Sequence, residues 1–553
     1  MRNIIQILYR EWALSAALAF FLLAVLCIEL PVLQFTHGLI VYPQDTTYLQ
    51  LATSKNLAFD HSWDLNIGFT HTPGPTSFSI LYSWLLALLF MGAGPLVFIP
   101  LLVNLAAGIT LLVVIHKWLA AQQIGRRSQL ISLIALIFFS SLPVLVAQGM
   151  EDTLQMLGVV LFVYELSAWL HAQSPMTTPA AAALPAVTAP TSVVAFPSAA
   201  SNTPAAPPDI PGRILLYGML VMTIRFEGIL LVLVACILLC TRRQWACAME
   251  LAFGSVLPFI CYGLYYLYWD KHFVLFPRGW WPPVSGTLWL GPLYVYVLIL
   301  VAATSLIFGR TLRKTAQYRY ILLLLMGTAA VQLFTIGAHL DGGWHGAWLI
   351  AGAIPVTGVL VARYGRQLFK GDIATAMVDM IHQFGAPGRL ILPALILILT
   401  LPLSWKSGEG FRTTVDSCMV MYKQEYQMAR FLTSYYNRDN AAVNDIGVTA
   451  YLKYGSKFDL VGSSVSDSAL VDSLMWKAGA KIAVISDSLY SHVLLSDWSK
   501  IASWQIDDRP TPGVRMLSFY AVDSVASDDL KKKLRAFQHS LPPGVAVRYY
   551  WGG

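Results

Sequence analysis

The sequence predicts an α-helical polytopic membrane protein with about 11 transmembrane helices, juxtamembrane helices and an extracytoplasmic α/β domain at its C-terminal end. Only 12% of the 553 residues are charged, about half of the ~25% usual for soluble domains, and the mean hydropathy is +0.60. Apolar stretches recur up to residue 405, whereas the last 148 residues contain 17 basic and 15 acidic side chains. A cytosolic enzyme with so few charges could not cover its surface, so that class is excluded.

Apolar stretches of about 16–24 residues, close to the ~20 needed to cross the hydrocarbon core, predict the spans. They lie near 12–33, 94–115, 129–148, 153–171, 246–268, 287–309, 320–338, 347–362 and 388–405. Residues 213–241 are long enough for a tight hairpin of two short helices, interrupted by Arg225-Phe226-Glu227-Gly228. Residues 78–93 either span the membrane or lie along its interface.

The distribution of basic residues decides between these two topologies. If 78–93 does not span, there are eleven spans, and 16 of the 20 basic residues of the membrane part lie on the same side as Arg2 and Arg10. If 78–93 does span, every later loop is inverted and the rule is broken several times. We therefore expect a cytoplasmic N-terminus and an extracytoplasmic C-terminal domain.

The same analysis predicts the domain organisation. Residues 1–405 form the membrane part, in which 34–93 is the first outward loop with its juxtamembrane helices. The Pro/Ala/Thr/Ser tract at 174–211 is predicted to be a disordered cytoplasmic linker, because its composition cannot pack a core. Residues 406–553 form the soluble domain, which we interpret as an acceptor-binding or structural module.

Within the soluble domain, short β-type runs alternate with helical ones. Helices are expected near 414–436 and 466–478, and β-type runs at AAVNDIGVTAYLKYG, KFDLVGSS and KIAVISD. This alternation favours a small α/β fold with a partly parallel sheet. The sequence shows no Walker or GxGxxG loop, so a nucleotide site is not indicated there.

Five outward loops bring carboxylates, bases and aromatic rings to one face of the membrane. They contain Asp45 and Tyr48; Glu151; Arg225 and Glu227; Lys271, His272, Arg278, Trp280 and Trp281; and Asp341, Trp344 and His345. A carboxylate can accept the proton of an attacking hydroxyl, basic groups can hold a leaving phosphate, and tryptophans can stack on sugars. This set indicates transfer from a lipid-phosphate donor. The positive charge is not clustered, so nucleic-acid binding is not indicated.

Each group also has a structural interpretation. The role of Asp45 could be no more than that of a cap on the helix that it begins, and Glu151 could cap the fourth span. Arg225 and Glu227 could form a buried ion pair, because an unpaired charge there would be too costly. Trp280 and Trp281 could belong to the aromatic belt.

No dedicated metal cage is predicted. Asp341 and His345 are close in sequence but lack the spacing of a metal motif, and the six cysteines form neither a CxxC pair nor a disulfide framework. No cofactor is required by the proposed chemistry, and a divalent cation stays open.

Several short segments, in this order, carry a family resemblance. They are PQDTTYLQLATSKNL (43–57), WDLNIGFTHTPGPTSFSILYSWLLALL (63–89), Gln148-Gly149-Met150-Glu151, Arg225-Phe226-Glu227-Gly228, Asp445-Ile446-Gly447 with Tyr451, and Asp459-Leu460 with Gly462. Together they resemble the bacterial GT-C superfamily of integral-membrane, polyprenyl-phosphate-sugar-dependent glycosyltransferases, in the branch of the mycobacterial terminal arabinofuranosyltransferases. The resemblance covers nearly the whole chain, although no single motif is highly specific.

The resemblance implies an inverting glycosyltransferase of the bacterial inner (plasma) membrane with a periplasmic domain. The sugar would move from a polyprenyl-phosphate donor to a glycan, lipid or protein acceptor of the cell envelope. It assigns catalytic roles to Asp45, as the base, and to Glu151, which with Glu227 would orient the acceptor or the basic groups, and it assigns the donor phosphate to basic groups. These are Arg225, Lys271, His272 and Arg278. Tyr48, Trp280, Trp281, Asp341, Trp344 and His345 would contact or orient substrate.

Two departures from the family pattern limit this inference. The acidic pair of the first loop is here Gln44-Asp45, so only one acid remains, and the later segment appears as Gly342-Gly343-Trp344-His345. Arabinose is therefore not carried over as the donor sugar. A secondary transporter or flippase, and a non-catalytic relative of the family, stay open as alternatives.

Overall fold

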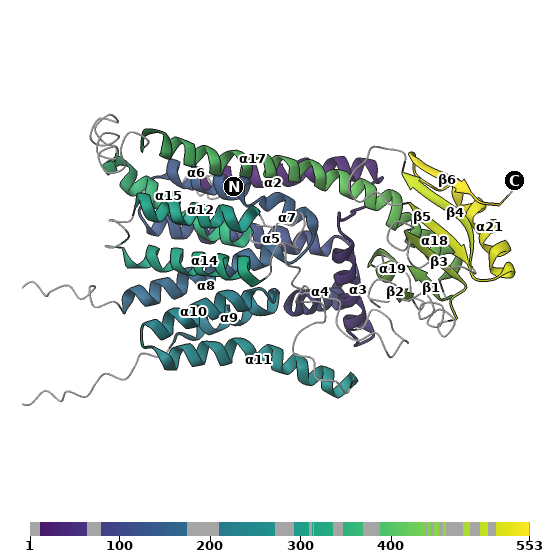
Figure 1. Ribbon diagram of the computed structural model, residues 1–553, viewed down its shortest axis with the longest axis horizontal. Helices are drawn as coiled ribbons and strands as arrows, with labels where there is room; N and C mark the ends of the chain where they lie inside the picture. The colour runs from purple at the N-terminus through teal and green to yellow at the C-terminus, as the bar shows by residue number, and fades with distance from the viewer. Residues whose placement is uncertain are drawn as a thin grey trace, which may run out of the picture.

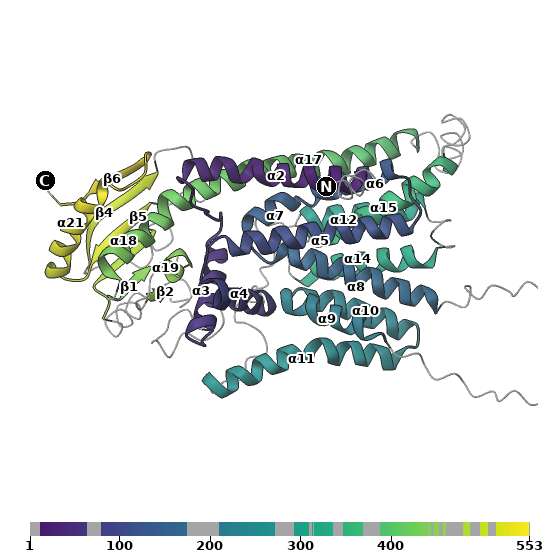
Figure 2. The same ribbon diagram turned by 180° about the vertical axis from the view of Figure 1, so that it is seen from behind.

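The computed structural model joins a bundle of helices to a C-terminal α/β domain that lies at one end of the bundle (Figure 1). It describes residues 11–63, 79–173, 210–270, 292–308, 312, 315–335, 347–368, 388–437, 439–443, 447–452, 457–459, 479–486, 498–506 and 516–551. One helix, α3 (Asp45–Phe59), lies across the bundle between these two parts, and Figure 2 shows the same arrangement from behind.

The bundle is built from helices that run side by side. They are α2 (Trp12–Phe35), α5 (Ile99–Ala121), α6 (Arg126–Phe139), α7 (Leu142–Gln148), α8 (Asp152–Ala172), α9 (Gly212–Ile224), α10 (Gly228–Thr241), α11 (Trp245–Asp270), α12 (Pro292–Ile307), α14 (Ala316–Thr335), α15 (Ala347–Leu368) and α17 (Gly388–Met421). Among the described residues, α2, α5, α8 and the first part of α11 are long and apolar enough to cross a membrane. The pair α6 and α7, bent by 45°, makes a fifth span if it is taken as one.

These helices confirm the predicted class, a mostly helical, multi-pass membrane protein. The count of eleven spans and the orientation in the membrane stay predictions. Helix α8 ends and α9 begins at the end of the bundle away from the C-terminal domain (Figure 1). The predicted linker between them lies outside the described residues, except for its last two positions.

Two local features of the sequence shape the bundle. The expected hairpin of short helices is present as α9 and α10, and Gly228 allows it to be tight, because a Cβ there would lie 2.2 Å from the Val221 carbonyl oxygen. The bend between α6 and α7 occurs at Ser141, which has a φ of +51°. The Ser141 hydroxyl is hydrogen-bonded to the Ser407 hydroxyl of α17 at 2.8 Å, so the polar group at the break has a partner.

Helix α4 (Ile80–Ala93) does not run the length of the bundle. Near its start, the Tyr82 hydroxyl donates to the Gly149 carbonyl at 2.9 Å, and beyond its end the Pro95 carbonyl accepts from the Tyr451 hydroxyl of the C-terminal domain. Both ends therefore lie on the side of the C-terminal domain. The juxtamembrane placement of 78–93 stays a prediction.

The C-terminal domain contains a six-stranded sheet in the order β2-β1-β3-β5-β4-β6. Its strands are β1 (Ala441–Val443), β2 (Lys457–Asp459), β3 (Ile482–Ser486), β4 (Ser499–Ile506), β5 (Leu517–Ala521) and β6 (Val545–Tyr549). Strand β1 pairs parallel with β2 and β3, and the other pairs are antiparallel, which confirms a partly parallel sheet. Phe431 of α18 (Gln427–Tyr436) packs against Trp504, Phe519 and the Phe537 ring of α21 (Ser524–Gln538).

One expectation about this domain is wrong. The run AAVNDIGVTAYLKYG was expected to be β-type throughout, but only its start forms β1, and Gly447–Leu452 form the short helix α19. The helix expected near 466–478 lies outside the described residues. The chain enters the domain as helix from Gly388 to Tyr436, through α17, the π-helical segment η3 (Tyr422–Tyr426) and α18, so the predicted boundary at 405 falls inside helix.

Candidate functional site

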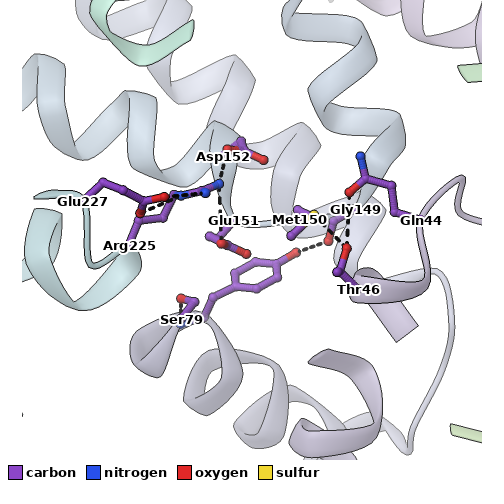
Figure 3. A network of polar contacts seen from close by, with 10 residues as sticks. Gln44, Thr46, Ser79, Gly149, Met150, Glu151, Asp152, Arg225 and Glu227 are labelled. Carbon is purple, nitrogen blue, oxygen red and sulfur yellow. Dashed lines mark hydrogen bonds and ion pairs between the residues drawn. The ribbon is translucent and has the colours of Figure 1, made fainter. Parts of the chain in front are cut away.

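Three segments meet at the end of the bundle that faces the C-terminal domain. They are the start of α3, the turn between α7 and α8, and the tip of the α9–α10 hairpin (Figure 3). The Thr47 hydroxyl donates to the Gln148 carbonyl at 2.8 Å, and the Thr46 hydroxyl lies 3.5 Å from the Met150 sulfur. The first turn of α3 is therefore held against the turn that carries Glu151.

A buried arginine surrounded by carboxylates forms the polar centre of the site. Arg225 bonds both carboxylate oxygens of Glu227, with its Nη2 2.9 Å from one and its Nε 3.2 Å from the other. Its Nη1 lies 2.5 Å from Asp152 and 3.7 Å from Glu151. The Arg225 side chain is 6% exposed and that of Glu151 is fully buried. The predicted ion pair of Arg225 with Glu227 is confirmed, within a larger cluster.

Burial controls the protonation of this cluster. Loss of hydration raises the pKa of Glu151 to about 7; Arg225 lowers this pKa, whereas the nearby Asp152 carboxylate raises it further. The neighbouring carboxylates, Glu227 first, raise the pKa of Arg225 against the effect of its own burial, so the guanidinium stays charged. Among the described residues, this positive charge lies beside three acids, and the raised pKa of Glu151 lets its carboxyl group change protonation near neutral pH.

The Glu151 carboxyl group has unused hydrogen-bonding capacity. Within the described residues neither of its oxygens has a hydrogen-bond partner, and the same holds for both amide atoms of Gln50 on α3. The Gln50 amide nevertheless lies close enough to the Glu151 carboxyl group for a weak hydrogen bond, which lowers the pKa of Glu151. Buried polar atoms normally have partners, so this pair is suited to meet a polar group of a ligand.

Two residues support the turn that presents Glu151. Gly149 has a φ of +72°, and a Cβ there would lie 2.4 Å from the ring of Tyr42, so glycine is required for both conformation and space. The Gly149 carbonyl accepts the Tyr82 hydroxyl, which in turn accepts from the Asn104 side chain at 2.9 Å. Tyr82 and Asn104 are both fully buried.

Replacing Tyr82 with phenylalanine is expected to destabilise the folded protein by about 1–3 kcal/mol, because the buried Gly149 carbonyl loses its donor. The measurement is thermal unfolding of the purified protein in detergent. Tyr217→Phe on α9 is the matched control, since no hydrogen bond of its hydroxyl is seen in the described part of the chain. Equal shifts of the two melting temperatures would contradict this role of Tyr82.

The structure brings together only some of the predicted site residues. Glu151, Arg225 and Glu227 belong to the buried cluster, whereas the Asp45 carboxylate points to the C-terminal domain and accepts from the backbone amides of Gly447 at 3.0 Å and Val448 at 3.3 Å. The interpretation of Asp45 as the cap of its own helix is wrong, because Gln44 holds the N-cap position.

Tyr48, predicted to contact substrate, is 1% exposed, and its hydroxyl accepts from the Tyr42 amide at 3.1 Å. Its ring also lies beside those of Tyr42 and Tyr451. In this structure it therefore packs the first loop against α19.

The remaining predicted residues lie outside the described part of the chain. They are Lys271, His272, Arg278, Trp280, Trp281, Asp341, Trp344 and His345. Among the described residues, no group of three or more His, Cys, Asp or Glu is placed to hold a metal ion.

Sequence reasoning did not select Asp152, Gln50, Tyr82 or Asn104. Asp152 directly follows Glu151, and a second acid in the same outward loop was a usable signal. The other three had no such signal, because their partners are distant in sequence.

No protein-family model matches this chain, and no curated protein matches it significantly. Among solved structures, the chain is similar to "Crystal Structure of ArnT from Cupriavidus metallidurans in the apo state". The sequence identity is 14% and the TM-score is 0.49, over 93% of this chain and 99% of that chain. The fold of this chain is therefore described from its own helices and sheet.

Proposed function

We propose that this chain is a GT-C-type membrane glycosyltransferase. It moves a sugar from a polyprenyl-phosphate donor to a hydroxyl-bearing acceptor at the outer membrane face, where the C-terminal domain lies. The observation that carries the proposal is the fully buried Glu151, with a pKa raised to about 7, beside Arg225 at the end of the bundle. A general base is most effective when its pKa lies near the working pH.

The proposed reaction is a single displacement with inversion. The ionised Glu151 carboxylate takes the proton of the acceptor hydroxyl, and the hydroxyl oxygen forms a bond to the anomeric carbon. The bond from that carbon to the phosphate oxygen breaks, and its electron pair leaves with the polyprenyl phosphate. The Gln50 amide, beside the Glu151 carboxyl group, is in a position to hold the acceptor hydroxyl in line.

The assignment of the base differs from the family resemblance, which pointed to Asp45. Both oxygens of the Asp45 carboxylate accept backbone amides of α19, so this group is engaged with the C-terminal domain and not with the buried cluster. Glu151 lies in that cluster, where burial favours the form that holds a proton. We therefore give proton transfer to Glu151.

Arg225 suits a positioning role better than a phosphate-binding role. Its donors already bond Asp152 and Glu227, and its Nη1 also lies 3.7 Å from Glu151. A phosphate would have to displace a carboxylate. We propose that Arg225 holds Glu151 in place and that the donor phosphate is bound by the predicted basic residues of the fourth outward loop, Lys271, His272 and Arg278.

A transfer assay tests this function. The purified chain is reconstituted in vesicles with a panel of labelled polyprenyl-phosphate pentoses and hexoses and with envelope glycan and lipid acceptors. We expect label transfer from one donor class by the wild type and by the matched control Glu165→Gln, whose carboxylate lies on the same helix and pairs with Arg213. Glu151→Gln should transfer label far more slowly. Donor binding without transfer by the wild type would favour the non-catalytic alternative.

A further inference from the structure

The short helix α19 is held at both ends by charges of α3. At its N-terminal end, the Asp45 carboxylate accepts from the Gly447 and Val448 amides. At its C-terminal end, the Lys55 ammonium donates to the Tyr451 carbonyl at 2.5 Å and to the Ala450 carbonyl at 3.4 Å. A negative charge at the start of a helix and a positive charge at its end both match the helix dipole.

Lys55 is committed to this contact. The residue is only 7% exposed, and its ammonium group lies 5.6 Å from the centre of the Tyr451 ring. A buried lysine is costly unless it is well bonded, and here it bonds two backbone carbonyls in the last turn of a helix. This contact accounts for the presence of a lysine in a loop that is predicted to face outward, where basic residues are few.

Gly447 and Tyr451 belong to a segment that carries the family resemblance but was given no function. Both residues contact the membrane-side part of the structure. A Cβ at position 447 would lie 2.3 Å from the Asp45 carbonyl oxygen and 2.4 Å from its carboxylate, so glycine is needed for the close approach. The Tyr451 hydroxyl donates to the Pro95 carbonyl in the connection between α4 and α5. The segment therefore contacts two separate parts of the membrane-side structure.

The opposite side of α3 faces the candidate site. Thr46 and Thr47 contact Met150 and Gln148 of the turn that presents Glu151, and Gln50 lies beside the Glu151 carboxyl group. Helix α3 thus lies between α19 and the turn. Any movement of α19 away from α3 removes bonds from the helix that supports the proposed catalytic carboxylate.

We propose that α19 is a docking element by which the C-terminal domain holds α3 over the site, with Asp45 and Lys55 as positioning residues. The domain then completes the site by fixing the helix from which Gln50 reaches Glu151. The docking itself is independent of any activity, whereas its effect on transfer rests on the proposed function.

Hydrogen exchange on the full-length protein in nanodiscs tests the docking. Lys55→Met and Asp45→Asn are expected to raise the exchange of amides 447–452 roughly tenfold, the effect of losing one charge-assisted hydrogen bond, with no change in β3 or β5. Lys55→Arg should restore protection. Lys532→Met, an exposed lysine of α21, is the control. Unchanged exchange of α19 in both Lys55→Met and Asp45→Asn would overturn the proposal.

A double-mutant cycle in the transfer assay tests the positioning role. Asp45→Asn and Gly447→Ala are each expected to lower kcat/KM by about tenfold. Because both substitutions remove the same contact, the double variant should be no less active than the less active single variant. In every variant, transfer should still rise with pH as the Glu151 carboxyl group loses its proton. Loss of that rise in Asp45→Asn alone would make Asp45 a base and refute positioning. If the variants show faster exchange of α19 but the wild type transfers no sugar, the docking proposal stands and the proposed function is rejected.

Discussion

Replacing Glu151 with glutamine is expected to lower the turnover of sugar transfer by about 10²–10⁴-fold, the usual contribution of a positioned general base. Glutamine keeps the shape of the side chain but cannot accept the acceptor's proton. Arg225 keeps Asp152 and Glu227 as partners in this variant, so we expect the fold and donor binding to be retained. The measurement combines single-turnover transfer with binding of the labelled lipid donor.

The wild-type pH dependence provides an independent check. Burial raises the pKa of Glu151 to about 7, so its carboxyl group is mostly protonated, and inactive as a base, below that pH. Transfer should therefore rise as the pH increases through about 7, and Glu151→Asp should keep a rising limb. The residual activity of Glu151→Gln should lack it. If Glu151→Gln kept the rise in transfer seen in the wild type, Glu151 would be excluded as the proton acceptor.

Replacing Arg225 with methionine is expected to destabilise the protein by about 3–5 kcal/mol, the cost of leaving buried charges without their partner. Three carboxylates, those of Glu151, Asp152 and Glu227, would then lose the guanidinium that lies between them. We expect a large fall in melting temperature, measured in detergent, and a smaller fall at acidic pH, where the carboxylates take up protons.

Two control variants make this result specific. Arg213→Met removes an arginine whose side chain is 67% exposed and which pairs with Glu165, so its cost should be within about 1 kcal/mol. Arg225→Lys keeps the charge but not the forked geometry, and should fall between the two. Similar melting temperatures for Arg225→Met and Arg213→Met would show that the buried cluster is not a major source of stability.

Contacts between neighbours in sequence were the part of the site that could be predicted. The pair Arg225 and Glu227 is two residues apart at a break between apolar helices, where only mutual pairing makes two charges tolerable. The third partner, Asp152, lies 73 residues before Arg225, and no local pattern links them. The same holds for Tyr82, whose partner Gly149 is 67 residues away.

The fold shows the same limit. Hydropathy predicted the bundle helices, because a single physical property, residence in lipid, acts on each segment separately. Helix α19 was missed because its valine, threonine and tyrosine favour strands. Its helical state is supported by Asp45, 402 residues distant from Gly447, and by Lys55. Tertiary contacts of this kind override local preference.

The unbroken helix from Gly388 to Tyr436 has a mechanical consequence. At about 1.5 Å per residue it is roughly 70 Å long, more than twice the ~30 Å thickness of a hydrocarbon core. Its length therefore sets the distance between the C-terminal domain and the opposite end of the bundle. It also sets the azimuth of the domain, because one added residue turns everything beyond it by about 100°. The position and direction of α19 relative to the bundle therefore depend on the number of residues in this helix.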